Sequence, residues 1–290
     1  MRWFLSLMFA AATGSIALAD DGPRPFASFD LAGPSVLNDP HDLAIGPDGR
    51  LYVADKFGSR IAVLDADSLE LVEVIAAGRL PGVHDVSFGS DGRAAVAVTG
   101  LGAVMVFDRL EGSDPKPSAI LAAPRTEGAV IHTNGTIYAM ASGTGTLVAY
   151  KDGTAVAAVQ GLFGAHDVAE DRDGNLWVAD NFSRRLVKFA PDLTLLQTLD
   201  DPKFGFAGPR YLDVDPFGRL VVADQDAHRV LLIDPDGPNG GSLLGVLGSG
   251  LPGKGPNLFD DPEGVAIDGN NYYIADSDNN RIVRYTIVVN

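Results

Sequence analysis

One unit of sequence recurs six times along the chain and constrains the fold more than any other feature. The four clearest copies alternate apolar residues, then carry Ala-Asp, and place an Arg five residues after the Asp. They read LYVADKFGSRIAVLD from Leu51, LWVADNFSRRLVKFA from Leu176, LVVADQDAHRVLLID from Leu220 and YYIADSDNNRIVRYT from Tyr272. Two weaker copies, from Ala94 and Ile137, lose both charges, and we expect shorter connections there. Such self-similarity indicates a repeat architecture.

Each copy is predicted to belong to a unit of four antiparallel strands. A short apolar run and a turn precede every copy, and four of the six turns are Asp-Gly or Asn-Gly, a strong hairpin signal. In five copies a further strand is predicted after the repeat, over Leu71–Ala76, Ser118–Leu121, Ala155–Gln160, Leu193–Leu199 and Leu243–Leu247. Four-stranded units of about 40–50 residues with almost no helix are typical of propeller blades. We therefore predict an all-β fold, a six-bladed β-propeller.

The two ends of the chain are predicted to share the last blade. The sixth unit ends after its third strand, over Ile282–Val288, and lacks a fourth strand. The segment RPFASFDLAG, which starts at Arg24, can supply the missing strand. Closing the ring in this way would remove exposed sheet edges.

Residues 1–19 are interpreted as a secretory signal peptide. Arg2 gives a positive start, an apolar run follows from Trp3 to Ala12, and Ala17-Leu18-Ala19 is a small-x-small cleavage site. The alternative is an uncleaved membrane anchor, but the run is shorter than the ~20 residues that span a bilayer. We therefore predict an exported protein, periplasmic or secreted, in which residues 20–290 form a single propeller domain.

Composition excludes several kinds of function. The chain has no cysteine, which rules out disulfides, thiolate metal ligands and a cysteine nucleophile. Its formal net charge of −16 repels phosphate backbones, so nucleic acid is not an expected partner. No membrane contact is expected after signal cleavage. The expected partners are a small-molecule or peptide substrate, or a protein bound on a propeller face.

Polar and ionisable residues recur where each inner strand begins. Aligning the six units places one of them at each position of a ring around the channel, namely His41, His84, Glu127, His166, Arg210 and Glu263. Imidazole and carboxylate suit zinc and similar divalent ions, so this ring is predicted to bind a metal or an anion at the channel mouth. The alternative is a wet mouth that tolerates any polar residue. His132 and His228 are expected to have structural or surface roles.

Two further sets of charged residues are interpreted as structural. The acids Asp42, Asp85 and Asp167 follow the ring histidines and should point away from them, because neighbouring strand residues face opposite ways. We expect these acids to accept hydrogen bonds from backbone amides, with orientation of a histidine as the alternative. The repeated Asp–Arg pair, such as Asp55 and Arg60, is expected to fix the connection after the second strand.

The repeated phrase resembles the NHL repeat, whose families form six-bladed propellers, and the resemblance covers essentially all of residues 20–290. The phrases VHDV and AHDV, with His84 and His166 on alternate blades, are similar to those of peptidyl-α-hydroxyglycine α-amidating lyase. That family binds zinc through three histidines. The resemblance implies that the phrase PEGV supplies Glu263 as the third ligand, with His41 as a further candidate. A His₂Glu zinc set leaves a fourth position open.

The Arg and Tyr that the lyase family uses near its metal are not matched here. Lys56-Phe57 and Ser142-Gly143-Thr144 stand in their places. We predict that Arg210 and Tyr211 replace them as catalytic residues, Arg210 as the anion-binding group and Tyr211 as the base. The resemblance therefore supports a metal site better than it supports that lyase reaction.

Three functions stay open from the sequence. The first is a lyase or hydrolase that depends on zinc or another divalent metal. The second is a non-catalytic envelope propeller that binds a peptide or a protein partner. The third is a calcium-dependent propeller similar to lactonases and esterases, which would need several Asn, Asp and Glu ligands in the channel. Metal analysis of the purified protein would distinguish these functions. Stoichiometric zinc would support the first, the absence of metal the second, and calcium the third.

Overall fold

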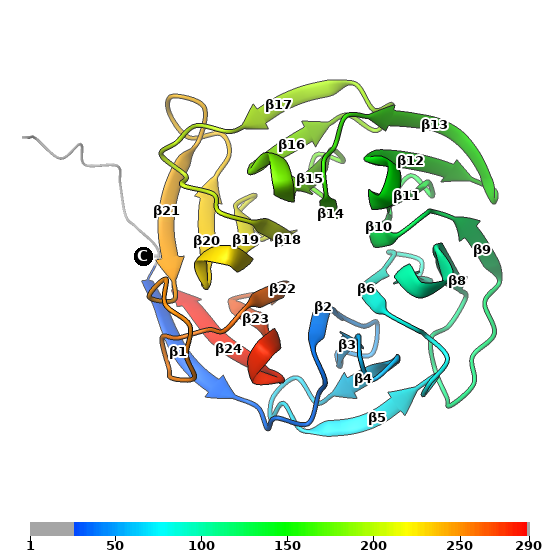
Figure 1. Ribbon diagram of the computed structural model, residues 1–290, viewed down its shortest axis with the longest axis horizontal. Coiled ribbons are helices and arrows are strands. Elements are labelled where there is room, and N and C mark those ends of the chain that lie inside the picture. The colour runs from blue at the N-terminus through cyan, green and yellow to red at the C-terminus, as the bar shows by residue number, and fades with distance from the viewer. Residues whose placement is uncertain (1–25, 289–290) are drawn as a thin grey trace, which may run out of the picture.

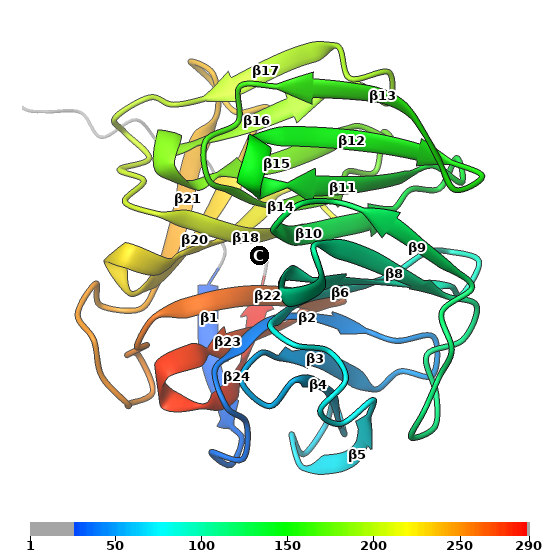
Figure 2. The same ribbon diagram turned by 45° about the vertical axis from the view of Figure 1, so that its right-hand side comes forward.

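The computed structural model describes residues 26–288 and confirms a closed, six-bladed β-propeller (Figure 1). Each blade is a four-stranded antiparallel sheet whose first strand lines the central channel, and Figure 2 shows these sheets obliquely. The predicted signal peptide, residues 1–19, lies outside the described residues. Within residues 26–288, no helix is long and apolar enough to cross a membrane.

The blades follow one another along the chain. Blades one and two are β2 (Pro40–Ile45), β3 (Leu51–Asp55), β4 (Arg60–Leu64) and β5 (Leu71–Ile75), then β6 (Val83–Phe88), β7 (Ala94–Val98), β8 (Ala103–Phe107) and β9 (Ala119–Ala122). Blades three and four are β10 (Thr126–Ile131), β11 (Ile137–Ala141), β12 (Thr146–Lys151) and β13 (Thr154–Gln160), then β14 (Ala165–Glu170), β15 (Leu176–Asp180), β16 (Arg185–Phe189) and β17 (Leu195–Leu199). Blades five and six are β18 (Pro209–Val214), β19 (Leu220–Asp224), β20 (Arg229–Asp234) and β21 (Ser242–Leu247), then β22 (Pro262–Asp268), β23 (Asn271–Asp276), β24 (Arg281–Val288) and β1 (Phe26–Ala32).

The N-terminal strand closes the ring as predicted. β1 pairs antiparallel with β24 as the outer strand of blade six, from Phe26 opposite Val288 to Ala32 opposite Val283. The first and the last described strands thus lie in one sheet, which leaves no gap between the last blade and the first.

The connection from the second to the third strand has four residues in all six blades, so the predicted shortening in the weaker copies is wrong. In five blades it forms a short 3-10 helix: η1 (Thr99–Leu101), η2 (Ser142–Thr144), η3 (Asn181–Ser183), η4 (Gln225–Ala227) and η5 (Ser277–Asn279). A left-handed residue ends each connection. Blades two and three place Gly102 and Gly145 there, where the other blades use residues such as Ser59 and Asn280. These connections lie around the mouth of the channel (Figure 1).

The Asp–Arg pairs are scaffold. In all four strong copies the Arg Nε contacts the Asp Oδ2, at 2.5 Å between Arg60 and Asp55 and at 2.7–2.9 Å in the others. In three of these blades the other carboxylate oxygen accepts a backbone N–H from the segment that enters the blade, for example from Asn38 at 2.6 Å. Six apolar clusters fill the spaces between successive blades. The hydrophobic core therefore does not depend on the channel residues.

Candidate functional site

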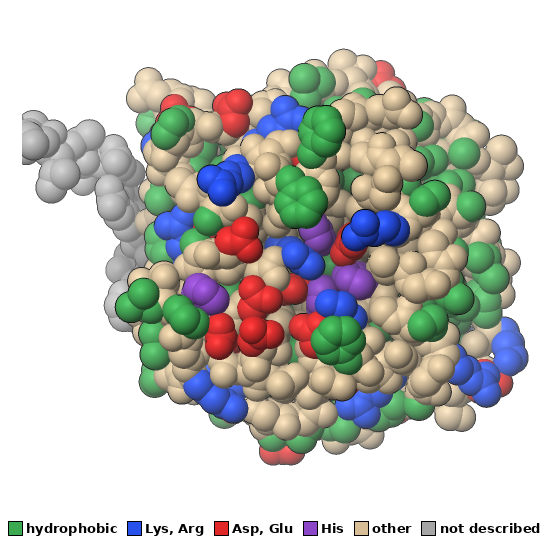
Figure 3. Space-filling model, in the orientation of Figure 1, with side chains coloured by type: hydrophobic (Ala, Val, Ile, Leu, Met, Phe, Trp, Pro, Cys, Tyr) green, Lys and Arg blue, Asp and Glu red, His purple; other side chains and the backbone are tan. Residues whose placement is uncertain are grey.

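The six predicted ring residues gather at one mouth of the channel, because all six inner strands begin there. Figure 3 views this mouth and shows histidine, acidic and basic side chains crowded at its centre. Five of the six are buried, and the side chain of Arg210 is 18% exposed. Residues that are far apart in sequence thus form one site.

Two ring histidines present an unprotonated Nε2 atom. The Nδ1 of His84 lies 2.7 Å from the carbonyl of Gly82, and the Nδ1 of His166 lies 2.6 Å from that of Gly164. A carbonyl only accepts, so each Nδ1 carries the proton. Burial lowers the pKa of His84 to about 3 and that of His166 well below its usual value, so both rings are neutral. Each Nε2 therefore carries a free lone pair.

Glu127 is the carboxylate that both lone pairs face. Its Oε2 lies 3.2 Å from Nε2 of His84 and 3.5 Å from Nε2 of His166. This oxygen is buried and has no hydrogen-bond partner. Burial also raises the pKa of Glu127, against the opposing charges of Arg210 and His41. Glu127 Oε2 thus lies between two acceptor nitrogens, an unfavourable contact that a cation or a proton between these atoms would make favourable.

His41 and Glu263 belong to a second group. His41 Nδ1 lies 2.5 Å from Glu263 Oε2, and its Nε2 lies 3.4 Å from Asp39 Oδ2. Burial alone would lower the pKa of His41, but these two carboxylates raise it. Both nitrogens of this fully buried ring thus face carboxylates, which favours its protonated form. Lys56 Nζ, 2.9 Å from Asp39, adds another positive charge to this group.

The predicted ligand set is thus divided between two places. Among the described residues, the only acid and histidine groups whose ligand atoms all lie within 4.8 Å of one another are Asp39–His41–Glu263 and Asp42–Asp85–Asp167. His84, His166 and Glu263 do not form such a group. His84, His166 and Glu127 do not satisfy it either, although Glu127 contacts both histidines. The metal itself stays a prediction.

Arg210 lies at the edge of a basin in front of the ring. Its Nη1 donates to Gln225 Oε1 at 2.6 Å, and its Nε lies 3.4 Å from Glu263 Oε2. Gln225 in turn donates to Glu263 at 2.9 Å and to Asp261 at 2.7 Å. The basin has a volume of about 380 Å³ and is lined from blades one, five and six. Its guanidinium suits the predicted role of Arg210 in binding an anionic group.

Tyr211 does not have the environment of a general base. It is fully buried, and its hydroxyl donates to the carbonyls of His84 at 3.2 Å and Glu127 at 3.1 Å. Burial raises the pKa of Tyr211 well above its usual value. The side chain crosses the channel from blade five to blades two and three, and the geometry supports a role in positioning rather than proton abstraction.

The Tyr211→Phe variant is expected to lose about 1–2 kcal/mol of unfolding free energy, because two buried carbonyls lose a shared donor while the ring volume is kept. Urea denaturation at pH 7.5 measures this loss. An unchanged midpoint and slope would mean that the hydroxyl does not hold the two inner strands.

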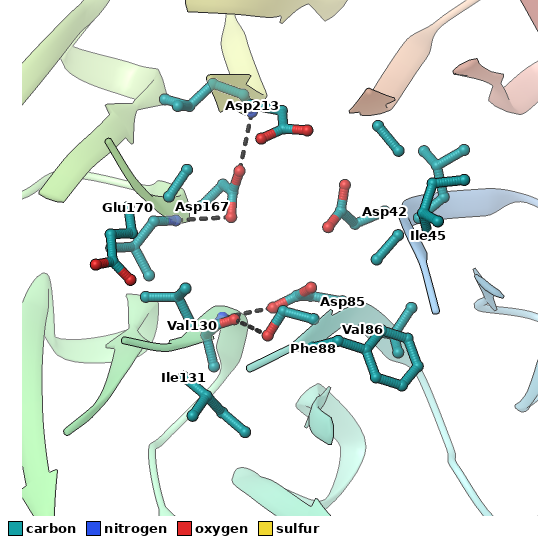
Figure 4. Close-up of a pocket in the computed structure, with 18 of the residues that line it drawn as sticks. Asp42, Ile45, Asp85, Val86, Phe88, Val130, Ile131, Asp167, Glu170 and Asp213 are labelled. Carbon is teal, nitrogen blue, oxygen red and sulfur yellow. Dashed lines mark hydrogen bonds between the residues drawn. The ribbon is translucent and has the colours of Figure 1, made fainter. Parts of the chain in front are cut away.

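A second group of acids lies deeper in the channel. These side chains face the channel, although strict alternation along the strands would turn them away from it. Figure 4 shows Asp42, Asp85 and Asp167 converging in a cavity of about 310 Å³. Asp85 and Asp167 accept the predicted backbone hydrogen bonds from the next blade, from Ala129 at 2.5 Å and Leu212 at 2.9 Å. They nevertheless face the channel, because a register irregularity begins every inner strand and breaks the alternation of side chains.

Asp213 lines the same cavity, and burial raises its pKa to about 6. A raised carboxyl pKa means that ionisation costs stability as the pH rises above about 4, and that the full cost applies above pH 6. The Asp213→Asn variant should therefore be more stable than wild type at pH 8, by up to about 3 kcal/mol. The difference should vanish below pH 4. Denaturation of both proteins at the two pH values tests this, and equal stability at pH 8 would contradict it.

The fold and the site define a class of protein, a six-bladed propeller with a ring of ionisable residues at its channel mouth. Residues 37–64 and 259–285 match the family model of the NHL repeat. The chain therefore carries NHL repeats, as predicted, in a six-bladed propeller. No curated protein matches the sequence.

Several solved propellers are similar in fold. A catalytically inactive histidine-to-alanine variant of virginiamycin B lyase from Staphylococcus aureus, with quinupristin, has a TM-score of 0.62 and 13% identity over 91% of this chain and 100% of that one. A protein of unknown function from Bacteroides thetaiotaomicron has a TM-score of 0.71 and 15% identity, over 91% and 76%. The PQQ-bound aldose sugar dehydrogenase of Streptomyces coelicolor has a TM-score of 0.61 and 14% identity, over 92% and 100%. At these identities the likeness shows the fold alone.

Proposed function

We propose that this chain is a divalent-metal-dependent lyase or hydrolase, exported from the cell, whose metal is held by His84, His166 and Glu127. One observation carries the proposal. Two neutral imidazoles aim their Nε2 lone pairs at a buried carboxylate oxygen that has no hydrogen-bond partner. Imidazole nitrogen with a carboxylate suits zinc and related ions, and backbone carbonyls hold each Nδ1–H as is typical behind metal-bound histidines. Glu127 thus replaces Glu263 in the set inferred from the sequence.

The residues around the ring support catalysis on a small or peptide-like substrate. A metal bound there would act as a Lewis acid on a substrate oxygen. Arg210, another member of the ring, offers a guanidinium at the edge of the neighbouring basin, where it can stabilise negative charge on the substrate. A lyase with a catalytically inactive histidine variant occurs among the propellers of similar fold, which agrees with histidine-based chemistry on this scaffold.

Metal content of the purified protein tests this proposal. We expect about one zinc or similar transition metal per chain, and chelation should lower the melting temperature because a ligand bound only to the folded state stabilises it. A protein that never retains metal, even after equilibration with zinc, manganese or calcium, would contradict the proposal and favour the non-catalytic binding propeller.

The calcium-dependent alternative gains one specific observation. Asp42, Asp85 and Asp167 offer oxygen atoms within 4.8 Å of one another in the buried channel, and calcium prefers such ligands. The same measurement separates the two functions. Calcium without a transition metal, retained by His84→Ala but lost from Asp85→Asn, would favour the lactonase-like function.

A further inference from the structure

The channel mouth, which includes the 380 Å³ basin, carries exposed aromatic side chains that the proposed chemistry does not use. Phe57, Phe163 and Phe182 are 64%, 68% and 75% exposed. Within residues 27–288, only one other phenylalanine, Phe217, is more than half exposed, and it belongs to the turn after the inner strand of blade five. Figure 3 shows large hydrophobic side chains on opposite sides of the charged centre. Exposed aromatic side chains concentrated at one mouth indicate an interaction site.

One of these rings, that of Phe182, lies next to a proposed metal ligand. Phe182 is in η3 of blade four, and its ring centroid is 6.4 Å from that of His166. Its backbone N–H donates to the carbonyl of Phe163 at 3.1 Å, which keeps the two residues together. Phe57 lies on blade one, across the mouth from blade four, and lines the 380 Å³ basin. Phe57 therefore borders the basin itself, whereas Phe163 and Phe182 lie on the opposite side of the channel mouth, beside His166.

The basin wall carries an excess of negative charge. Lys56 pairs with Asp39 at 2.9 Å, and Arg210 pairs with Glu263 at 3.4 Å. Asp261 and Asp278 line the same basin, and within residues 26–288 neither has a basic side chain within 4 Å. A ligand group that neutralises these two carboxylates must be positive.

We propose that the channel mouth selects a small molecule or peptide end that carries a positive charge beside an aromatic or large apolar group. Phe57, Phe163 and Phe182 contact the apolar group, and Asp261 and Asp278 contact the cation. This inference rests on the proposed function, because it names the substrate class of the same site. Burying an exposed phenyl ring and pairing an exposed carboxylate each favour binding, and the two contributions should be separable.

Four dipeptide probes test the two features independently by calorimetric titration of the full chain. Phe-Phe amide has both features, Gly-Gly amide has only the cation, acetyl-Phe-Phe amide has only the rings, and acetyl-Phe-Phe acid replaces the cation with an anion. We expect Phe-Phe amide to bind at least about fivefold more tightly than each of the other three. Equal affinities, tighter binding of the anionic probe, or no binding of Phe-Phe amide would overturn the proposal.

Variants assign the two contributions to residues. Phe182→Ala should weaken both phenylalanine amides and leave Gly-Gly amide unchanged, whereas Asp278→Asn should weaken only the two cationic probes. Phe217→Ala and Asp152→Asn, in turns away from the basin, are the matched controls and should change nothing. Metal content measured on the same preparations, after equilibration with zinc, manganese or calcium, separates the two proposals. The preference in a protein that never retains metal would defeat the metal-dependent function alone, and a bound metal without the preference would defeat this inference alone.

Discussion

Deleting β1, residues 26–32, is expected to lower the melting temperature by more than about 10 °C, because blade six loses its outer strand. β1 pairs with β24 along its length and packs Ala27 and Phe29 against the cluster between blades five and six. Its loss would leave β24 as an unpaired edge and uncover that cluster, which also favours aggregation. Thermal unfolding monitored by circular dichroism measures the effect.

A matched pair of point variants controls for the deletion. Phe29 faces the core and its ring lies 5.8 Å from that of Tyr285, whereas Ser28 is exposed on the same strand. Phe29→Ala should cost about 2–3 kcal/mol, and Ser28→Ala should cost almost nothing. A deletion variant that melts with wild-type protein would show that closure by β1 does not stabilise the propeller.

His84→Ala and His166→Ala are each expected to weaken metal binding by more than about 100-fold while the propeller stays folded. Each variant removes an Nε2 lone pair that no neighbouring group replaces. The fold should persist because the apolar clusters lie between blades and contain neither histidine. Metal content after dialysis, beside a melting curve, measures both effects.

His228→Ala is the control for these two variants. His228 lies near Asp260 at 3.5 Å, away from the ring contacts, and should not affect bound metal. Full metal content in both His84→Ala and His166→Ala would place the metal elsewhere in the chain.

Much of the fold could be predicted because each blade repeats the same local signals. The Asp-Gly and Asn-Gly turns, the alternating strands and the missing sixth outer strand together determine a closed ring, and a closed ring brings the first inner-strand residues to one mouth. His41, His84, His166 and Arg210 could therefore be placed at that mouth from alignment alone.

The pairing inside the ring could not be predicted in the same way. The alternate-blade pattern of the amidating lyase implies Glu263 as the third ligand. His84, Glu127 and His166 instead lie on three consecutive blades, where neighbouring inner strands are closest. The alignment contained this signal, since Glu127 already stood between the two histidines. The contacts of His41 with the carboxylates of Asp39 and Glu263 could not be predicted without the positions of the side chains.

The orientation of the three acids deeper in the channel differs from the prediction because of the local backbone conformation. Strict alternation would turn Asp42, Asp85 and Asp167 away from the channel, but the irregular start of each inner strand turns them inward. A bulge of this kind leaves no clear mark in a short apolar strand. Tyr211 occupies the same position in blade five. Its buried side chain also points into the channel, where its hydroxyl donates to the carbonyls of His84 and Glu127.

Metal content of Glu127→Gln beside Glu263→Gln tests the central claim most directly. Both variants replace a buried ring carboxylate with its neutral isostere, so general damage to the mouth should affect them alike. We predict that Glu127→Gln loses most of its metal, because the charged oxygen facing both Nε2 atoms is gone. Glu263→Gln should keep its metal and lose only the ion pairs to His41 and Arg210. Full metal content in Glu127→Gln, together with loss of metal from Glu263→Gln, would contradict this prediction. It would favour the set of His84, His166 and Glu263 on alternate blades.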